Sequence, residues 1–347
     1  MLKKYFSFIL IISFLCILMY STLTSQTLSP QKAVISVERI WDRAGHNAFT
    51  DFIKFKDKFY CCFREGSGHV YGINGTVRIL SSIDGQNWFS VAHLYEKDVD
   101  LRDPKLSITP DGRIMVIMGG SFYEGKKFLK REPWVSFSDT DGKNFSNPQN
   151  ISIDAAIKSD VDWLWRVTWF KGKGYGVVYQ AFAQEFKAHL VSTTDGVNYF
   201  YITTFNITGK PNEATLCFAS DGKVIAIIRR EGEDKYGFIG TSNPPYKKWL
   251  WENLGIRLGG PDFIRLPDGS LLCGTRNYQF QKNYKTSLFK ITTDGNSILI
   301  LNLPSSGDTG YPGLFIDGNI LYVSYYSSHE GKTAVYLAKL WINSLLH

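Results

Sequence analysis

The chain has 347 residues, of which 44% are hydrophobic and 15% aromatic, so it is long enough to bury one large core. Its formal net charge is +7, but the lysines and arginines form no dense run, which argues against a nucleic-acid partner and favours either an anionic ligand or none in particular. The 31 glycines and the many aromatic side chains favour short strands joined by tight turns over helices.

Residues 1–25 have the pattern of an export signal. Two lysines precede an unbroken apolar run from Phe6 to about Tyr20, and small polar residues follow it. An uncleaved membrane anchor is the alternative, although the run falls short of the roughly 20 residues that a bilayer core requires. We therefore expect a secreted or periplasmic protein, without stable membrane insertion after cleavage, whose single domain covers residues 26–347.

The cysteines that follow this signal are few: Cys61, Cys62, Cys217 and Cys273. So sparse a set, with two members adjacent, is not a disulfide framework and is better explained by packing in the core. No CxxC pair or histidine cluster in the sequence indicates zinc. We expect neither a metal nor an organic cofactor.

One hairpin pattern recurs six times, roughly every 50 residues: an apolar strand, a short polar turn and a second apolar strand. Asp-Gly between apolar strands is a strong hairpin signal because both central positions of the turn need positive φ. The six turns lie near Asp57, Asp111, Gly172, Asp221, Asp268 and Asp317.

A second turn motif lies between these hairpins. It reads SIDGQNW, DTDGKNF, TTDGVNY and, in degenerate form, TTDGNSI, with aspartates Asp84, Asp141, Asp195 and Asp294. The motif resembles the Asp-box, or BNR repeat, of the sialidase superfamily in a form one residue shorter than usual. We expect each of these aspartates to cap its own turn, and each aromatic ring to pack between neighbouring sheets.

A repeat of about 50 residues that holds two hairpins makes one four-stranded sheet, and six such sheets around an axis form a closed ring. The sequence therefore predicts an all-β protein, a six-bladed β-propeller of sialidase-like type. Residues 26–45 either add a strand that closes the ring or lie outside it.

Charged residues stand at the ends of the repeated hairpins. Glu213 and Arg229 lie 16 residues apart at the two ends of one apolar hairpin, so folding brings them to the same end in space. For any single residue a solvated surface position is the simpler interpretation. Arginines and carboxylates at equivalent ends of several repeats would nevertheless converge on one face of the ring, where mutual pairing offsets the cost of burial.

Glu213, Arg229 and Tyr311 match the sialidase pattern: a Glu that begins one inner strand, an Arg that closes the same hairpin and a Tyr that begins a later inner strand. The resemblance implies a retaining exo-glycosidase in which Tyr311 attacks the anomeric carbon, Glu213 is its base and arginines bind the substrate carboxylate. A neutral phenol is a poor nucleophile, which is the reason to pair it with a carboxylate. Arg229 and Arg276 would fill two of the three arginine positions of the superfamily.

The first of those arginines lies in a Phe/Tyr-Arg-Ile-Pro motif at the start of the first blade, where this chain reads FTDFIKF. Arg64 or Arg102 would have to reach the same point from a neighbouring strand. If neither does, the third arginine is missing.

The general acid of the superfamily is an Asp in a loop before the first Asp-box. The corresponding loop here contains Glu65 and His69 but no Asp. Glu65 is our first candidate and Asp103 the second, because a protonated carboxyl group near the leaving oxygen is the usual general acid. His69 is a candidate if its pKa stays near the working pH.

Trp163, Trp165 and Trp169 alternate at strand spacing. Packing in the core explains them. A flat platform for a sugar ring, with Trp165 beside a substrate-binding Arg166, is the alternative.

We thus expect an exported sialidase-like glycoside hydrolase acting on an acidic glycan or glycoconjugate. A carbohydrate-binding propeller without catalysis is the second hypothesis. The third is a hydrolase or lyase for another uronate-like glycan, in which Glu65, His69 and Asp103 carry the chemistry.

Overall fold

The computed structural model describes residues 33–281 and 283–345. The predicted signal segment lies outside these residues. No helix within the described residues is long and apolar enough to cross a membrane. The one named helical element is a short 3-10 turn, η2 (Ile342–Ser344).

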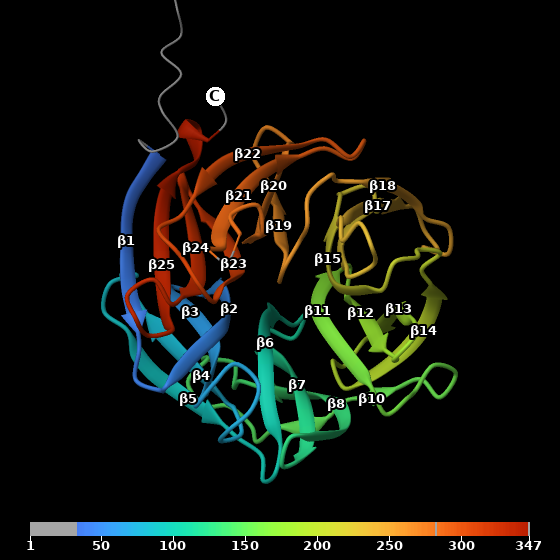
Figure 1. Ribbon diagram of the computed structural model, residues 1–347, viewed down its shortest axis with the longest axis horizontal. Helices are drawn as coiled ribbons and strands as arrows, with labels where there is room; N and C mark the ends of the chain where they lie inside the picture. Colours follow the sequence, from blue (N-terminus) through green and yellow to red (C-terminus); the bar gives the residue numbers. More distant parts are fainter. Residues whose placement is uncertain (1–32, 282, 346–347) are drawn as a thin grey trace, which may run out of the picture.

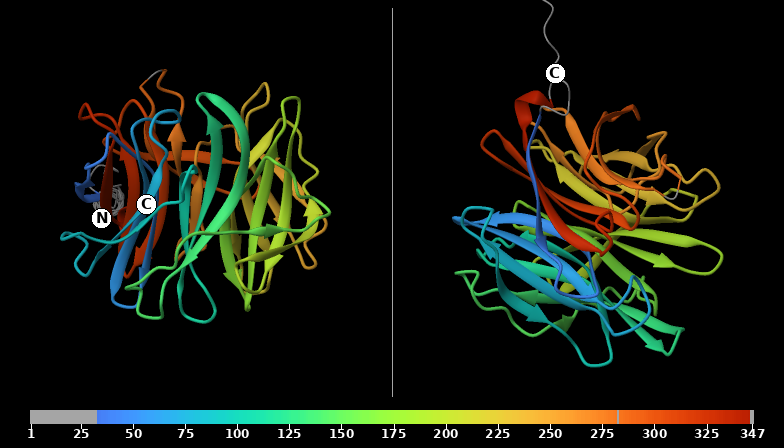
Figure 2. Two further views of the ribbon diagram at one scale, coloured as in Figure 1. Left: turned by 90° about the horizontal axis from the view of Figure 1, so that it is seen from below. Right: turned by 60° about the vertical axis from the view of Figure 1, so that its left-hand side comes forward.

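Six sheets stand around a central axis, so the fold is the six-bladed β-propeller that the sequence predicted (Figure 1). Seen from the side, the strands run between the two faces of the ring (Figure 2). Blade 1 contains β2 (His46–Phe55), β3 (Lys58–Gly66), β4 (Thr76–Ser82) and β5 (Phe89–Leu94). Blade 2 contains β6 (Asp100–Ile108), β7 (Ile114–Glu124), β8 (Lys127–Phe137) and β9 (Gln149–Asn150). Blade 3 contains β11 (Asp162–Phe170), β12 (Lys173–Ala181), β13 (Phe186–Thr193), β14 (Asn198–Thr204) and β10 (Ser152–Ile153).

The chain continues around the ring in the same direction. Blade 4 contains β15 (Pro211–Phe218), β16 (Val224–Arg230), β17 (Phe238–Ser242) and β18 (Leu250–Asn253). Blade 5 contains β19 (Asp262–Arg265), β20 (Leu271–Asn277), β21 (Lys285–Ile291) and β22 (Ser297–Asn302). Blade 6 contains β23 (Thr309–Asp317), β24 (Ile320–Ser327), β25 (Ala334–Trp341) and β1 (Val34–Trp41).

The ring is closed by the first strand. β1 pairs antiparallel with β25, so blade 6 combines the beginning and the end of the described chain. Of the two alternatives for residues 26–45, the closing strand is therefore correct for residues 34–41. Closure leaves no open edge between the first and last blades.

Each predicted hairpin joins the innermost strand of a blade to its second strand. Hydrogen bonds from threonine side chains link inner strands of adjacent blades: Thr50 Oγ1 donates to the Tyr311 carbonyl at 2.9 Å and Thr215 Oγ1 to the Pro261 carbonyl at 2.8 Å. These bonds fix the relative height of the inner strands, which decides which side chains meet at the ring face.

The core is divided among the spaces between blades. Successive residues of a strand point to opposite faces of its sheet, so Cys61 packs between blades 6 and 1 and Cys62 between blades 1 and 2. All four cysteines of the domain are free thiols, and Cys61, Cys62 and Cys273 are buried. Core packing, and not a disulfide framework, is thus their role.

The turns with the DG motif differ from one another in which aspartate caps them. The backbone N–H groups of Asn87 and Gln86 each donate to Asp84 Oδ1 at 2.8 Å, and these bonds hold the pKa of Asp84 well below its usual range. Asp195 caps its turn in the same way. In the second turn, however, Asp139 accepts the backbone bonds, and the expectation for Asp141 is wrong.

Candidate active site

Several side chains of the ring face come from β-bulges in the inner strands. In five of the six inner strands the register with the second strand shifts after Ala48, Arg102, Leu164, Pro211 and Gly310. A bulge removes its residues from the ladder and re-aims their side chains. The side chains released in this way belong to Phe49, Asp103, Trp165, Arg166, Glu213 and Tyr311.

Three of these residues have left-handed backbone conformations: φ is 63° at Phe49, 49° at Asp103 and 51° at Tyr311. Such conformations cost of order 1 kcal/mol or more in non-glycine residues and cluster at functional sites. Asp103 and Tyr311 both precede a proline, which cannot donate to the ladder. The two prolines thus interrupt the pairing of the inner strands with their neighbours at the positions of these site residues.

Tyr311 and Glu213 form a direct pair. The Tyr311 hydroxyl donates to Glu213 Oε1 at 2.6 Å, and the Gly260 backbone N–H donates to the other carboxylate oxygen at 2.7 Å. Arg229 Nη1 donates to both Glu213 Oε1, at 2.8 Å, and the Tyr311 oxygen, at 3.0 Å. Both members are buried.

Burial and the charge of Glu213 raise the pKa of Tyr311 well above that of a free phenol, although Arg229 opposes the rise. The phenol is therefore neutral until its proton passes to a base in contact with it. Burial alone would lower the pKa of Arg229, but Glu213 and Tyr311 raise it well above its usual value, so the guanidinium stays charged. A neutral phenol, a carboxylate and a permanent cation are thus in direct contact with one another.

Arg229 also contacts a second carboxylate, outside the Tyr311–Glu213 pair. Its Nε donates to Glu231 Oε1 at 2.8 Å, and Arg257 Nη2 donates to Glu231 Oε2 at 2.8 Å. Burial would raise the pKa of Glu231, but the two guanidinium groups lower it. Glu231 is thus an ionised bridge between Arg229 and Arg257.

Arg276 approaches the pair from β20. Its Cζ lies 5.4 Å from the centroid of the Tyr311 ring. Its Nη2 donates to the Tyr326 hydroxyl at 2.6 Å and to Asp308 Oδ1 at 3.2 Å. Arg276 is therefore placed beside Tyr311 but is already partnered by Asp308.

Two histidines meet at the other oxygen of Asp308. His46 Nε2 lies 2.8 Å and His69 Nδ1 2.7 Å from Asp308 Oδ2. Burial would raise the pKa of Asp308, but the two hydrogen bonds keep it far below its usual range. The three ligand atoms lie within 4.8 Å of one another, a donor set that could bind a divalent metal, although Arg276 on the same carboxylate adds positive charge there.

Asp103 is the carboxyl group of the site that has no fixed partner. Among the described residues nothing donates to its buried Oδ1. Burial raises the pKa of this carboxyl group, and Arg102 opposes the rise. A carboxyl group in such surroundings keeps its proton to higher pH than a solvated one.

The two neighbours Arg64 and Glu65 face opposite sides of β3. Arg64 is fully buried and donates to Asp100 Oδ1 through Nε at 2.9 Å and Nη2 at 2.7 Å. Glu65 accepts from Trp41 Nε1 at 2.6 Å and from Arg78 Nη2 at 2.8 Å. Among the described residues, neither side chain forms a hydrogen bond or an ion pair with Tyr311 or Glu213.

Phe49 occupies the bulge of blade 1. The Phe49 ring centroid lies 5.1 Å from that of Tyr311 and 5.1 Å from that of His69. Arg102 lies over Phe49, with Cζ 5.5 Å from the ring centroid, and donates to the His69 carbonyl. Arg102 therefore fixes the loop that carries His69 over the site.

Trp165 and Arg166 lie at the bulge of β11, in the centre of the ring. Trp165 is 1% exposed, and its ring centroid lies 5.7 Å from that of Tyr311. Arg166 Nη1 donates to both oxygens of Asp51 at 2.9 Å, and its Nη2 lies 3.5 Å from Asp262 Oδ2. Trp165 thus packs edge-on against the Tyr311 ring, and Arg166 links the inner strands of blades 1, 3 and 5.

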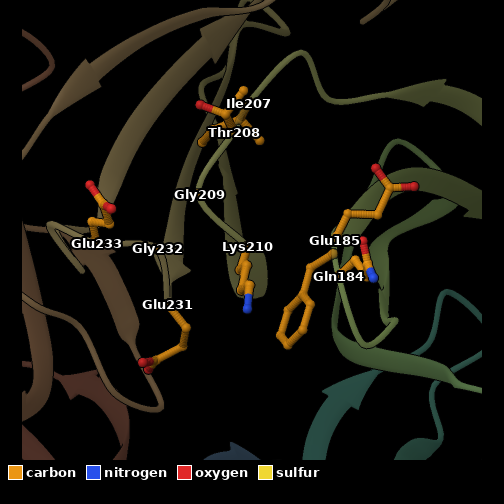
Figure 3. A pocket seen from close by; sticks show the side chains of 10 residues that line it. Gln184, Glu185, Ile207, Thr208, Gly209, Lys210, Glu231, Gly232 and Glu233 are labelled. Atoms are coloured by element: carbon orange, nitrogen blue, oxygen red, sulfur yellow. The ribbon is translucent and has the colours of Figure 1, made fainter.

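A pocket of about 600 Å³ adjoins the site between blades 3 and 4 (Figure 3). Its lining is formed by three loops, at residues 184–186, 207–210 and 231–233. Glu231, the bridge between Arg229 and Arg257, belongs to this lining. The pocket is thus connected to the Tyr311 pair through two side chains, Glu231 and Arg229.

Sequence reasoning did not select several residues that the structure brings to the site: His46, Phe49, Glu231, Arg257, Gly260, Asp308 and Tyr326. One signal was available for some of them. The pairs Asp103–Pro104, Gly260–Pro261 and Tyr311–Pro312 recur at the start of three inner strands. Asp308 directly precedes inner strand β23, and Arg257 lies in the connection between β18 and β19.

No protein-family model matches the sequence, and no curated protein does. The structure is similar to that of a protein of unknown function from Dyadobacter fermentans, with a TM-score of 0.77 and 21% identity over 89% of this chain and 98% of that one. It is also similar to the sialidase of Trypanosoma rangeli in complex with sialic acid, with a TM-score of 0.67 and 11% identity over 91% of this chain. This chain spans 58% of that sialidase.

The intramolecular trans-sialidase of Ruminococcus gnavus, in complex with oseltamivir carboxylate, matches with a TM-score of 0.65 and 12% identity over 90% of this chain and 99% of that one. At these identities the likeness establishes the fold alone. The chain is a six-bladed propeller that resembles sialidases.

Proposed function

We propose that the protein is an exported, retaining glycoside hydrolase that uses Tyr311 as nucleophile and Glu213 as its base. The observation that carries the proposal is the 2.6 Å hydrogen bond from the Tyr311 hydroxyl to Glu213, with Arg229 bonded to both residues. An apolar segment at residues 6–20 supports export.

In the first step the Tyr311 proton passes to Glu213 while the phenolic oxygen attacks the anomeric carbon. The bond from that carbon to the leaving oxygen breaks, and the leaving oxygen takes a proton from the general acid. In the second step water attacks the same carbon and gives its proton to the conjugate base of that acid, while the phenolic oxygen leaves and recovers its proton from Glu213. Two displacements at one carbon retain its configuration.

Asp103 is the best-supported general acid. Its carboxyl group has a raised pKa and no fixed partner among the described residues, so it can hold a proton and deliver it. The carboxylate of Glu65, the first candidate from the sequence, is occupied by Trp41 and Arg78. His69 has one ring nitrogen on Asp308 and is the second candidate.

A glycan with acidic character is the proposed substrate class. The net positive charge of the chain supports it, and the Trypanosoma rangeli sialidase of the same fold was solved in complex with sialic acid. The first blade opens with FTDFIKF and lacks the arginine motif that the resemblance implies, which favours an anionic group placed differently from that of sialic acid. The same difference keeps a carbohydrate-binding propeller without catalysis as the second candidate.

The test is covalent trapping. Incubation with a panel of 2-fluoroglycosyl fluorides, including 3-fluorosialyl fluoride, followed by peptide mass spectrometry, should place a glycosyl group on Tyr311 in the native protein and on no residue in Tyr311→Phe. A label on another side chain would overturn the mechanism. Specific binding of glycans without hydrolysis or label would establish the second candidate.

A further inference from the structure

The cations beside Tyr311 are already matched by carboxylates of the protein. Arg229 and Arg257 share Glu231, at 2.8 Å each, and Arg276 contacts Asp308 at 3.2 Å. A ligand anion at these arginines would compete with charges that cannot leave. Negative charge on a ligand is therefore better placed next to a cation that has no internal partner.

Lys210 is such a cation, in the pocket between blades 3 and 4. Within the described part of the chain, no carboxylate oxygen lies within 4.0 Å of its Nζ, although Glu185, Glu231 and Glu233 line the same pocket. Glu185 is paired with Lys187 at 3.2 Å, and Glu231 with the two arginines. Figure 3 shows the Lys210 side chain pointing between the loops that carry Glu231 and Glu185.

Lys210 has a strained backbone conformation. Its φ is 58°, a left-handed value that a lysine rarely adopts, and it follows Gly209 with φ 82°. Its Nζ lies 5.9 Å from the ring centroid of Phe186, which is half-buried at the pocket wall. A lysine ammonium above an aromatic ring offers both a charge and a flat apolar surface to a sugar.

The walls of the pocket are built to be rigid. A Cβ on Gly232 would lie 2.7 Å from the Cα of Gly209, so the two loops touch where neither has a side chain. Buried Arg230 donates to the Thr208 carbonyl at 2.6 Å and to Asp234 at 3.1 Å, which ties both loops to the end of β16. A preformed pocket loses little conformational entropy when it binds.

The pocket is joined to the nucleophile by a short chain of contacts. Glu231 lines it, Arg229 donates to Glu231 at 2.8 Å, and the same guanidinium donates to the Tyr311 oxygen at 3.0 Å. These contacts link the pocket wall to the Tyr311–Glu213 pair. The volume of about 600 Å³ is within the range of small-ligand pockets.

We propose that this pocket binds a second sugar unit that carries a carboxylate or a sulfate, with Lys210 on the anionic group and Phe186 against the ring. The inference rests on the proposed function, since it assigns the acidic unit of the glycan to the position next to the cleaved bond. The protein then recognises the negative charge of the glycan mainly in the pocket between blades 3 and 4, and not at the sugar that reacts.

The test measures binding by isothermal titration calorimetry in a Glu213→Gln background, which prevents turnover. The probes are trigalacturonate for carboxylate, neocarrabiose sulfate for sulfate and the methyl ester of trigalacturonate as the neutral counterpart. Lys210→Gln should weaken binding of each anionic probe about fivefold and reduce the salt dependence of that binding. Lys210→Arg should keep both the affinity and its salt dependence. The neutral probe should be unaffected.

Lys171 is a matched control because it also has a left-handed backbone, with φ 48°, and places its Nζ 5.1 Å from the centroid of an aromatic ring, that of Phe170. It differs in position, since it directly follows the last residue of β11, the inner strand of blade 3. Lys171→Gln should leave every affinity unchanged. Equal affinities of the Glu213→Gln parent and its Lys210→Gln derivative for both anions, or no binding of either anion at millimolar concentration, would overturn the inference.

Hydrolysis of small aryl glycosides separates the two proposals, because such substrates do not reach the pocket. Tyr311-dependent hydrolysis with no effect of Lys210 on anion binding would overturn only the pocket assignment. Lys210-dependent binding without any hydrolysis would keep the anion pocket and overturn the enzymatic function.

Discussion

The Tyr311 hydroxyl lies 2.6 Å from Glu213 Oε1, although 98 residues separate them and they belong to blades 6 and 4. Both residues stand at bulges of inner strands, so the closed ring, and not local sequence, brings them together. The contact is a proton path from a buried phenol to a carboxylate that is held by Arg229 and the Gly260 N–H.

Replacing Glu213 with Gln should remove that path. The amide cannot accept the phenolic proton, and the buried phenol has a raised pKa, so we expect kcat to fall by about 10²- to 10⁴-fold. Steady-state kinetics on a hydrolysed glycoside, with a thermal melt to show that the fold is kept, measures this. Glu252→Gln, on the exposed outer strand β18, is the control and should keep its rate. Equal rates in both variants would remove Glu213 from the mechanism.

The sequence was sufficient to predict the propeller because six hairpins of similar length repeat along it. Tyr311, Glu213 and Arg229 were selected because they match the sialidase pattern, and the structure places them on two inner strands and one second strand. The bulges were not predictable from alternation, because a bulge changes which face the following residues occupy.

Arg64 and Glu65 show a second limit of prediction from the sequence. Alternation along a strand requires that the two face opposite sides of β3, but it does not say which side holds a partner. The structure supplies Asp100 to Arg64 from blade 2, and Trp41 to Glu65 from the closing strand β1. Partners such as these come from other blades, and no local pattern identifies them.

Gly260 should be intolerant of any side chain. Its φ is 58°, and a Cβ there would lie 2.2 Å from Cγ of Tyr311. Gly260→Ala should therefore displace the Tyr311 ring and reduce kcat by at least about tenfold. Gly318 is a matched control, with φ 58° and nothing within 4 Å of its Cβ position, at the turn after β23.

Both alanine variants carry the same backbone strain, which should cost of order 1 kcal/mol of unfolding free energy. Gly260→Ala should lose more than Gly318→Ala because its Cβ also overlaps the Tyr311 ring. The loss of activity should belong to Gly260→Ala alone. A fully active Gly260→Ala protein would mean that the position of the Tyr311 ring does not matter for turnover.

Asp103 should control the alkaline side of the activity profile. Burial raises the pKa of its carboxyl group, so the proton-donating form persists above the usual range for Asp and is lost as pH rises through the raised value. Asp103→Asn should abolish that pH dependence and slow glycosides with poor leaving groups more than aryl glycosides. The profile of kcat/KM against pH for both substrate types measures it.

Asp98→Asn is the control for this change, since Asp98 is exposed and also has a left-handed backbone, with φ 60°. An alkaline limb that survives in Asp103→Asn would exclude Asp103 as the acid. In that case His69, which faces Asp308 at 2.7 Å, is the next residue to change.

Arg166 should matter for stability more than an exposed arginine does. It donates to both oxygens of Asp51 at 2.9 Å, and the Asp51 side chain is fully buried. Removing one partner leaves an uncompensated buried charge, which costs about 3 to 5 kcal/mol. Arg166→Met should therefore lower the unfolding free energy by that amount in urea titration. Arg113→Met, which breaks the exposed pair with Asp111 at 2.7 Å, should cost less than about 1 kcal/mol. Equal losses in the two variants would show that the ions at the centre of the ring are not what holds the inner strands of blades 1 and 3 together.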